Sequence, residues 1–299
     1  MPTFIVLLGP TGVGKTDISI DVARRLGTEI VSGDSRQIYR EMRIGTAAPT
    51  PEQLAAAPHH FVLSHSVHER YTAGKYEMEA LSLLDKLIAE HKAALMVGGS
   101  GLYIDAVCHG IDAFPEVDPA LRATLMAQYK QEGLDPLRQQ LKLLDKESYL
   151  ALDMKNPRRI IRALEVTLAT GKPYSSFKKE HRQPRPFRIV KIGLQRPREA
   201  LYERINRRTV QMMNEGWFDE ARSLYPFRHL PALNTVGYKE LFDHFDGKAG
   251  LDDTIALIQQ HTRNYAKKQY SYWRRYNDIR WMDASEPEKI VSLCLKLIE

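Results

Sequence analysis

Eight residues near the start of the chain form a candidate phosphate-binding loop. They fit the pattern Gly-x-x-x-x-Gly-Lys-Thr and read Gly9-Pro10-Thr11-Gly12-Val13-Gly14-Lys15-Thr16. In such a loop, glycines let backbone N–H groups converge on phosphate oxygens, the lysine neutralises charge, and the threonine hydroxyl can ligate Mg²⁺. A chance match is the alternative, but a strand-like stretch precedes the loop and a helix-like stretch follows it. The pattern therefore predicts a diphosphate or triphosphate site.

Asp34 is the second residue with an evident chemical use. It follows residues 29–32, a short stretch that predicts a strand, so we expect it at the carboxyl edge of the sheet, where ligands of such folds bind. A carboxylate there can take a proton as general base or hold Mg²⁺ through water. The alternative is a turn aspartate that caps backbone N–H groups.

The end of another expected strand, residues 93–97, carries Gly98-Gly99-Ser100. Nucleotide hydrolases usually have an acidic residue at this place to position Mg²⁺, so ordinary NTP hydrolysis loses support. The loop could instead hold the diphosphate of some other substrate. A glycine-rich turn used only for close packing is the alternative.

The elements that must position these residues alternate between strand-like and helix-like stretches in the first third of the chain. Strands are expected at residues 4–8, 29–32 and 93–97, and helices at residues 15–26 and 77–90. This alternation is typical of an α/β fold, here a P-loop NTPase-like parallel sheet wound with helices.

The middle of the chain changes to long polar helices. They are expected at residues 119–132, 135–144 and 157–170, before a strand at residues 187–194 returns to the sheet and the chain becomes helical from residue 198. We therefore expect an inserted all-helical subdomain. The predicted division is residues 1–111 for the first part of the core, 112–185 for the insertion and 186–299 for the second part.

Composition favours an acidic partner. The chain has 43 Lys and Arg residues and 37 Asp and Glu residues, which gives a formal net charge of +6. The basic residues cluster at residues 155–162, 172–188, 196–208 and 263–280. RNA is a suitable partner for such surfaces, although the charge alone does not require it.

The cysteines and the N-terminal residues bear on location. Cys108 and Cys294 have no Cys-x-x-Cys spacing, so neither a disulfide framework nor a cysteine-rich zinc site is indicated. The apolar run at residues 4–8 lacks a basic leader and is too short for a signal segment or a membrane span. We expect a soluble cytoplasmic protein that does not bind membranes.

Three further features have a structural interpretation beside the functional one. Residues 263–276 combine cations with aromatic rings, which suits RNA stacking, but a packed amphipathic helix is the more frequent case. Residues 156–162 open a helix with three arginines, for which a solvated face is the default. His59 and His60 lack a third ligand at metal spacing, so we interpret them as structural or loop contacts.

As an ensemble, motifs spread over the chain resemble those of the bacterial tRNA dimethylallyltransferase family. The motifs are Gly9-Pro10-Thr11-x-x-Gly14-Lys15-Thr16, Asp34-Ser35-Arg36-Gln37-Ile38-Tyr39, Ile44-Gly45-Thr46-Ala47, Pro58-His59-His60, Gly98-Gly99-Ser100-Gly101-Leu102-Tyr103, Asn156-Pro157-Arg158-Arg159, Asn234-Thr235-Val236-Gly237-Tyr238-Lys239 and Arg263-x-Tyr265-Ala266-Lys267-Lys268-Gln269. The phosphate loop alone is shared by many proteins, whereas the ensemble is specific.

The resemblance implies transfer of a dimethylallyl group from dimethylallyl diphosphate to N6 of adenosine 37. This adenosine lies 3′ of the anticodon in tRNAs that read codons beginning with U, and it must flip out of its stack. The loop would hold the departing diphosphate, and the cofactor would be Mg²⁺. A monomer is expected.

The resemblance also implies residue roles. Asp34 would take the proton of the attacking amine, Lys15 and Arg208 would stabilise the diphosphate, and Thr16 would ligate Mg²⁺; Arg207, next to Arg208, stays an alternative. The residues implied to contact tRNA, besides Asp34, are Ser35, Arg36, Gln37, Ser100, Gly101, Arg158, Arg159, Ile160, Ile161, Arg162, Val236, Gly237, Tyr238 and Lys239.

Two departures and two rival functions complete the sequence-based hypothesis. Ala48 replaces a lysine common in the family, which removes a cation near the substrate loop, and Ser100 replaces a threonine but keeps its hydroxyl. With two cysteines the chain lacks the zinc finger of eukaryotic relatives. A P-loop nucleoside or small-metabolite kinase is the main alternative, and a non-catalytic RNA-binding protein is the third.

Overall fold

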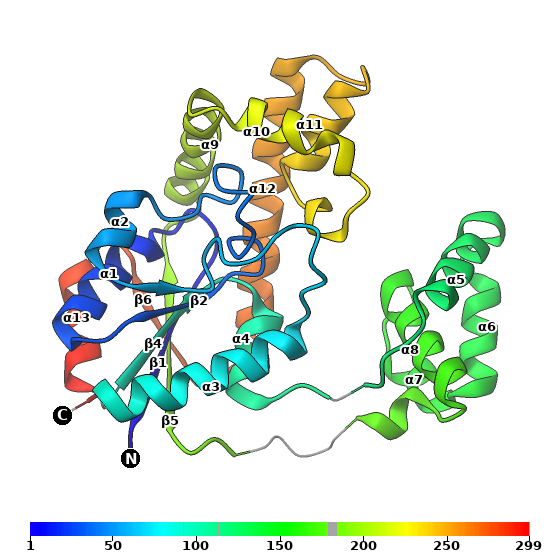
Figure 1. The fold of residues 1–299 in the computed structure, drawn as a ribbon, viewed down its shortest axis with the longest axis horizontal. Helices are drawn as coiled ribbons and strands as arrows, with labels where there is room; N and C mark the ends of the chain where they lie inside the picture. The colour runs from blue at the N-terminus through cyan, green and yellow to red at the C-terminus, as the bar shows by residue number, and fades with distance from the viewer. Residues whose placement is uncertain (92, 113, 179–183, 299) are drawn as a thin grey trace. The chain divides into compact units, whose positions relative to one another are not determined.

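The computed structural model describes residues 1–91, 93–112, 114–178 and 184–298 (Figure 1). It divides into two compact units, of which unit 1 comprises Met1–His109 with Arg185–Glu299, and unit 2 comprises Gly110–Pro184. The sequence-based division lies at residues 112 and 185. Each unit has its own core and is described by itself.

Unit 1 is built on a parallel sheet of six strands in the order β3-β2-β4-β1-β5-β6. The strands are β1 (Thr3–Leu8), β2 (Ile30–Gly33), β3 (His59–His60), β4 (Ala93–Gly98), β5 (Arg188–Gln195) and β6 (Ile279–Asp283). Every residue of β1 and β4 is buried, as expected for central strands of a sheet that is covered on both faces. The predicted α/β fold is confirmed.

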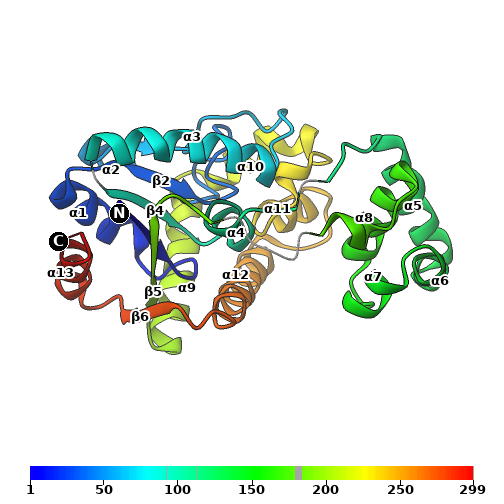
Figure 2. The same ribbon diagram turned by 90° about the horizontal axis from the view of Figure 1, so that it is seen from below.

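The two faces of the sheet have separate apolar cores because successive side chains of a strand point to opposite sides. Phe4, Val6 and Leu8 of β1 belong to a core shared with α3 (Ala73–His91) and α4 (Gly101–His109). Ile5 and Leu7 belong to the other core, shared with α1 (Lys15–Leu26) and α13 (Pro287–Lys296). Figure 2 shows α3 and α13 on opposite sides of the sheet.

The register of the strands determines which loops lie together. Leu8 of β1 and Gly33 of β2 both pair with Gly98 of β4, which lies between these two strands. The chain therefore leaves all three strands at the same level of the carboxyl edge. Gly9, Asp34 and Gly99 begin the three segments that follow, so the predicted site residues lie on adjacent strand ends.

The remaining helices of unit 1 lie between strands in the chain, one between β2 and β3 and the others between β5 and β6. They are α2 (Pro51–Ala56), α9 (Arg198–Asn214), α10 (Trp217–Leu224), α11 (Tyr238–Phe245) and α12 (Leu251–Trp273). Helices α9 and α12 pack against each other, and both place side chains on the phosphate loop.

One sequence-based prediction about the fold is wrong. The chain is not helical throughout from residue 198, because Ile279–Asp283 forms β6 and pairs in parallel with β5. A five-residue edge strand has mostly half-buried side chains, so its apolar pattern is weak in the sequence. The short strand β3 was likewise not anticipated, although His59 and His60 make the structural contacts expected of them, with Ala57 O and Glu29.

Unit 2 is a helical subdomain with α5 (Pro119–Glu132), α6 (Asp135–Leu144), α7 (Lys146–Ala151) and α8 (Pro157–Thr170). Three of the helices begin at side-chain caps: Asp118 accepts from Ala120 N, Asp145 from Ser148 N and Asn156 from Arg159 N. The core of the unit contains Leu125, Leu137, Leu141, Ile160, Ile161, Ala163 and Leu164. The three helices predicted in this region are confirmed.

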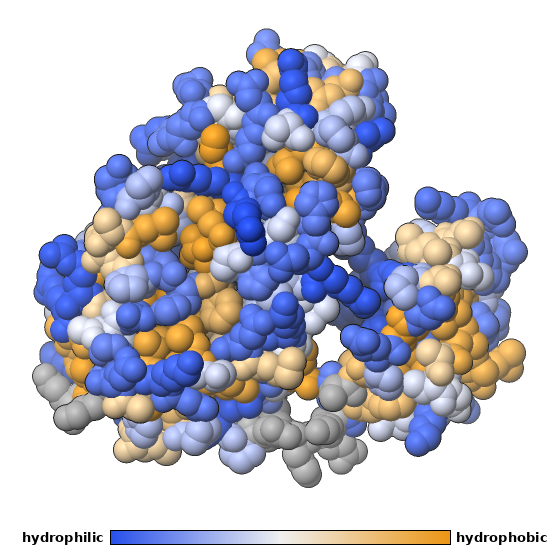
Figure 3. Space-filling model, viewed as in Figure 1, coloured by the Kyte–Doolittle hydropathy of each residue, from blue (hydrophilic) through white to orange (hydrophobic). Residues whose placement is uncertain are grey.

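The surface visible in Figure 3 is mostly polar, and both cysteines lie in the interior. Figure 3 shows hydrophilic residues over most of the visible face, with smaller apolar areas between them. Among the described residues, no helix has both the length and the apolar character needed to cross a membrane. Cys108 and Cys294 are buried free thiols.

Candidate active site

The phosphate loop has the backbone conformation that its glycines predict. Gly12 and Gly14 have φ angles of 80° and 103°, in the left-handed region that favours glycine. Gly9 packs so tightly that an added Cβ would lie 2.9 Å from Leu194 O. Helix α1 begins at Lys15, and the first N–H groups of a helix have no intrahelical acceptor. The loop thus offers backbone donors to an anion.

Lys15 folds back over the loop. Its Nζ donates to Gly9 O at 3.0 Å and to Pro10 O at 2.9 Å. Burial lowers the pKa of the Lys15 ammonium to about 8, the charge of Asp34 raises it, and the charge of Arg208 lowers it further. Because a bound anion would favour the protonated form, this lysine is suited to titrate upon diphosphate binding.

Helix α9 brings Arg208 to the loop. Its Nη2 donates to Thr11 Oγ1 at 2.5 Å, whereas the neighbouring Arg207 is exposed. Burial lowers the pKa of Arg208 below its ordinary value, and the charge of Asp34 opposes this shift. Of the two arginines that the sequence left open, the one at the phosphate loop is therefore Arg208.

Three other side chains, to which the sequence analysis assigned no role, contact the loop. Gln269 of α12 accepts from Thr11 N at 2.9 Å and donates to Gly99 O at 2.9 Å, which ties the phosphate loop to the end of β4. Arg204 and Arg196 donate to the loop carbonyls Gly12 O and Val13 O. Gln269 is the last residue of the motif at residues 263–269, where it was assigned no role, and no local signal distinguishes Arg196 and Arg204 from their neighbours in the basic stretch 196–208.

Asp34 holds a turn, as one interpretation of the sequence expected, and also has an oxygen available for the chemical role that the other expected. Its Oδ1 accepts from Arg36 N at 2.8 Å and from Gln37 N at 3.3 Å, so the side chain does hold a turn. Its Oδ2 has no hydrogen-bond partner in the part of the chain that the structure describes. One oxygen therefore fixes the orientation of the carboxylate, and the other remains available to a ligand.

Ser100 links the end of β4 to the loop after Asp34. Its Oγ accepts from Ser35 N at 2.9 Å and donates to Ser35 Oγ at 3.1 Å. The glycines around Ser100 serve close packing as well, since an added Cβ would lie 2.3 Å from Gly33 O at Gly98 and 2.1 Å from the ring of Tyr272 at Gly101. The close-packing interpretation of this turn is therefore confirmed.

Arg36 and Gln37 connect the loop after β2 to neighbouring segments through side-chain hydrogen bonds. Arg36 Nη1 donates to Ala232 O at 2.9 Å, and Gln37 Nε2 donates to Ala47 O at 2.9 Å. Ala47 has a φ of 50°, which is unusual for a residue other than glycine and shows that the loop around it is tightly constrained. Both side chains are half-buried at the same edge as Asp34.

Tyr238 and Gly237, two predicted tRNA contacts, are packing residues. The Tyr238 side chain is fully buried, and its hydroxyl donates to Glu220 Oε1 at 2.6 Å. A Cβ added to Gly237 would lie 2.0 Å from the ring of Trp217. The side chain of Tyr238 is therefore not available to RNA, and the tRNA contact of residues 236–239 stays a prediction for the backbone and for Val236 and Lys239. Val236 is half-buried and Lys239 is exposed.

Glu220 connects the motif that contains Gly45 to the motif that contains Tyr238. Its carboxylate accepts from Ile44 N at 2.7 Å and Gly45 N at 2.9 Å, in addition to the hydroxyl of Tyr238. The loop containing Gly45 is thereby fixed against α10 and α11.

The predicted tRNA contacts at residues 158–162 of unit 2 are partly on the surface and partly in the core. Arg158 and Arg159 are exposed, and Arg162 is half-buried, with Nη1 3.4 Å from Glu165 Oε2. Ile160 and Ile161 are fully buried in the core of unit 2. The turn of α8 points both isoleucine side chains inward, so the predicted tRNA contact of residues 158–162 stays a prediction for the arginines and the backbone.

The basic and aromatic segment at residues 263–276 is mainly a packed helix end. Trp273 is fully buried, and the hydroxyls of Tyr272 and Tyr276 both donate to Asp105 Oδ2. The packing interpretation is therefore confirmed for Tyr272, Trp273 and Tyr276, whereas the ring of Tyr265 is exposed. Lys267 and Lys268 remain exposed on α12.

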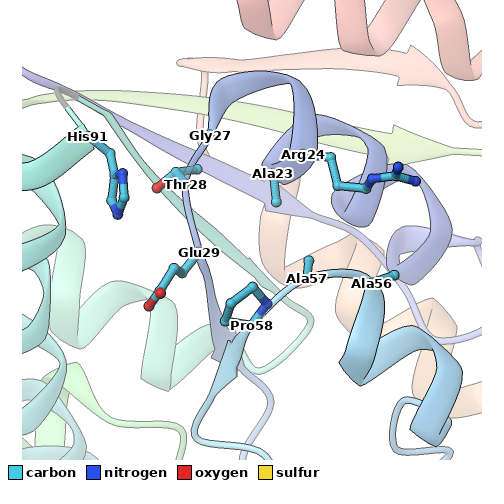
Figure 4. Close-up of a pocket in the computed structure, with 9 residues that line it drawn as sticks. All are labelled: Ala23, Arg24, Gly27, Thr28, Glu29, Ala56, Ala57, Pro58 and His91. Carbon is cyan, nitrogen blue, oxygen red and sulfur yellow. The ribbon is translucent and has the colours of Figure 1, made fainter.

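A shallow cleft elsewhere on unit 1 is not part of this site. It has a volume of about 280 Å³ and lies near the amino end of β2, where Arg24, Glu29 and His91 line it (Figure 4). In parallel α/β sheets, ligands bind at the carboxyl ends of the strands. The candidate site is consequently the opposite edge, with the phosphate loop and Asp34.

This fold and this loop define an enzyme core of the phosphate-binding α/β class, with a lysine and an arginine on the loop and a carboxylate beside it. A family model described as "IPP transferase" matches residues 37–276. The chain therefore belongs to the IPP transferase family.

Individual relatives agree with this assignment. The chain is 54% identical to "tRNA dimethylallyltransferase 2" of Porphyromonas gingivalis over 279 residues. The matched region covers 93% of each protein. It is 51% identical to "tRNA dimethylallyltransferase 1" of Bacteroides fragilis, covering 97% of this chain and 96% of that protein.

A solved structure supports the fold in the same way. The full-length tRNA isopentenylpyrophosphate transferase of Bacillus halodurans is 33% identical, has a TM-score of 0.73, and is matched over 100% of this chain and 97% of that one. The chain is accordingly an enzyme that transfers a prenyl group to tRNA. The kinase alternative is not favoured.

Proposed function

We propose that the enzyme transfers the dimethylallyl group of dimethylallyl diphosphate to N6 of adenosine 37, 3′ of the anticodon. The tRNAs are those that read codons beginning with U, and the products are N6-dimethylallyladenosine and diphosphate. The observation that carries this proposal is the placement of Asp34 and the cationic loop on strand ends that flank β4. A base for the amine and a site for the leaving group thus lie at one edge of one sheet.

The leaving group is held by the loop at Gly9 to Thr16. Lys15, with its pKa lowered by burial, becomes fully protonated as the diphosphate binds, and Arg208 adds a second charge beside Thr11. Both cations act as the allylic C–O bond breaks, because negative charge then collects on the diphosphate oxygens.

Asp34 acts on the nucleophile. The N6 lone pair forms the new C–N bond to the allylic carbon while the C–O bond breaks, and one N6 proton passes to Oδ2 of Asp34. An exocyclic amine is a weak nucleophile, so the orientation fixed through Oδ1 contributes more than the basicity of the carboxylate. The adenine must leave its stack to reach this edge.

The residues present fit Mg²⁺ as a cofactor. Thr16 offers a hydroxyl in the first turn of α1, and the end of β4 offers no carboxylate. Within the described residues, no cluster of three His, Cys, Asp or Glu side chains is suited to a metal. Mg²⁺ commonly takes few protein ligands and completes its shell with phosphate oxygens and water. When bound, it would neutralise charge on the diphosphate.

The proposed tRNA contacts lie on both units. Beside the flipped base we place Ser35, Arg36, Gln37, Ser100 and Gly101, and for the anticodon arm we assign Arg158, Arg159 and Arg162 of α8. Val236 and Lys239 form a further contact. We also propose that the enzyme works as a monomer in the cytoplasm.

The test incubates the purified protein with Mg²⁺, dimethylallyl diphosphate and an unmodified anticodon stem-loop with adenosines at positions 36, 37 and 38, followed by nucleoside mass spectrometry. The expected result is one dimethylallyl mass gain, on adenosine 37 alone. A gain on another adenosine contradicts the proposed position. ATP consumption on a small acceptor, with no prenyl transfer, would return the kinase to first place.

A further inference from the structure

Two arginines that no sequence motif singles out hold the outer side of the phosphate loop. Arg204 Nε donates to Gly12 O at 3.0 Å, and Arg196 Nε donates to Val13 O at 2.8 Å. They therefore bind consecutive carbonyl groups of the loop. Neither arginine has an acidic side chain as a hydrogen-bond or ion-pair partner within the part of the chain that the structure describes.

The two guanidinium groups lie over the same point of the backbone. A Cβ added to Gly14 would be 3.6 Å from Nη2 of Arg196 and 3.6 Å from Nη2 of Arg204. Burial lowers the pKa of Arg204, the neighbouring charges of Arg196 and Arg207 lower it further, and the charge of Asp17 opposes the shift. Two like charges are thus held together at the start of α1, an arrangement that a bound anion would stabilise.

The hydrogen bonds also determine which way the loop faces. Carbonyls that accept from a guanidinium on the outer side leave the peptide N–H groups of the loop directed inward, toward a phosphate. A charge-assisted bond to a carbonyl polarises its peptide group and strengthens the donor on the other side of it. Arg204 and Arg196 can therefore act on a bound anion without touching it.

Each arginine is anchored by a different part of the fold. Arg196 Nη2 also donates to Ala284 O at 2.7 Å, just after β6, and its backbone N–H donates to the hydroxyl of Tyr270. Arg204 is on α9, one turn before Arg208, so the same helix supplies an arginine to the outer carbonyl and one to Thr11. A substitution at Arg204 therefore removes a contact to the phosphate loop and leaves the contacts of the sheet strands in place.

We propose that Arg204, supported by Arg196, is a positioning residue for the diphosphate of the prenyl donor. It holds the carbonyl side of the loop and raises the positive potential at the start of α1, so that the N–H groups and Lys15 meet the anion in a fixed arrangement. This inference rests on the proposed role of the loop as the diphosphate site.

The experiment measures inorganic pyrophosphate binding by calorimetry in the presence of Mg²⁺, for the wild type, Arg204→Gln, Arg204→Lys and Arg207→Gln. Arg207 is the matched control because it is the exposed neighbour on the same helix. We expect the Kd for pyrophosphate to rise about tenfold in Arg204→Gln, to recover in part in Arg204→Lys, and to stay unchanged in Arg207→Gln.

The Kd for an anticodon stem-loop is measured in parallel and should stay unchanged in all variants, as should the thermal melting temperature of the lysine variant. Unaltered pyrophosphate binding by Arg204→Gln would overturn the inference. Equal losses of pyrophosphate and stem-loop binding would also overturn it, because they indicate a general structural role. If the wild type itself binds no pyrophosphate, the proposed function of the loop fails instead. Should Arg204→Gln not fold, Arg196→Gln gives the same comparison.

Discussion

The arginines around the phosphate loop and those at the start of α8 have the same chemistry in opposite surroundings. Arg208 and Arg204 bind a hydroxyl and a carbonyl of the loop, so their positions are determined before any ligand arrives. Arg158 and Arg159 are exposed, and their guanidinium groups have no hydrogen-bond or ion-pair partner among the described residues.

This difference indicates two kinds of anion recognition. A preorganised set of donors suits a compact diphosphate, whose charge grows at a known place during the reaction. Exposed surface arginines suit the backbone of an RNA, which is long, flexible and recognised largely through screened charge. The predictions below separate the two regions, beginning with the carboxylate that works beside the loop.

The largest effect is expected for Asp34→Asn. The amide oxygen can still accept from the N–H groups of Arg36 and Gln37, so the turn is kept and only the proton acceptor is lost. We expect kcat to fall by about 10²- to 10⁴-fold, which is the usual range for a general base. Single-turnover kinetics with a stem-loop substrate measure this, and the Kd for the stem-loop should not change. A matching loss of RNA affinity would mean that Asp34 mainly positions RNA.

Arg208→Gln should come next. Removal of one donor that stabilises developing charge commonly lowers kcat by about 10²-fold. Arg207→Gln, one residue away and exposed, should leave kcat within about twofold. Steady-state kinetics with varied dimethylallyl diphosphate compare the two. Similar losses in both variants would contradict the assignment of the loop contact to Arg208.

The pH dependence of pyrophosphate binding should be smaller and graded. Lys15 has a pKa of about 8 in the free protein, so it is protonated below pH 8 and loses its charge above it. Binding requires the charged form and therefore takes up a proton at higher pH, so the Kd should rise by up to about tenfold per pH unit above pH 8.

Lys15→Arg provides the control for this titration, because arginine keeps its charge over the same range. Pyrophosphate itself ionises, but this contribution is common to both proteins, so the difference between the two pH profiles reports Lys15. Parallel profiles from pH 7 to pH 10 would show that Lys15 is charged throughout.

The smallest effect should come from the exposed arginines of α8. For the double change Arg158→Ala and Arg159→Ala we expect the Kd for the stem-loop to rise about fivefold at low salt and the slope of log Kd against log salt to fall by about two. Pyrophosphate binding should be unaffected. An altered Kd for pyrophosphate, or an unchanged salt slope, would remove the contrast between the two regions.

Much of the site could be predicted because its signals are local. The glycine spacing at Gly9, Gly12 and Gly14 specifies a loop conformation that other residues rarely adopt, and the buried strands read as continuous apolar runs. The positions of Lys15 at the start of α1 and of Asp34 at the end of β2 follow directly from these patterns. The three long helices of unit 2 were predicted for the same reason, since their periodicity is contained in short stretches, whereas the six-residue α7 was too short to show one.

The sequence by itself therefore determined the α/β class, the phosphate loop and the carboxylate beside it. Only the tertiary structure decided that Arg208 and not Arg207 meets the loop, that Tyr238, Ile160 and Ile161 face inward, and that Arg204 and Arg196 hold the loop from outside. Adjacent residues of a helix point about 100° apart, and the side that faces the site depends on what the helix packs against. That choice is made by contacts between segments far apart in the chain, which no local pattern contains.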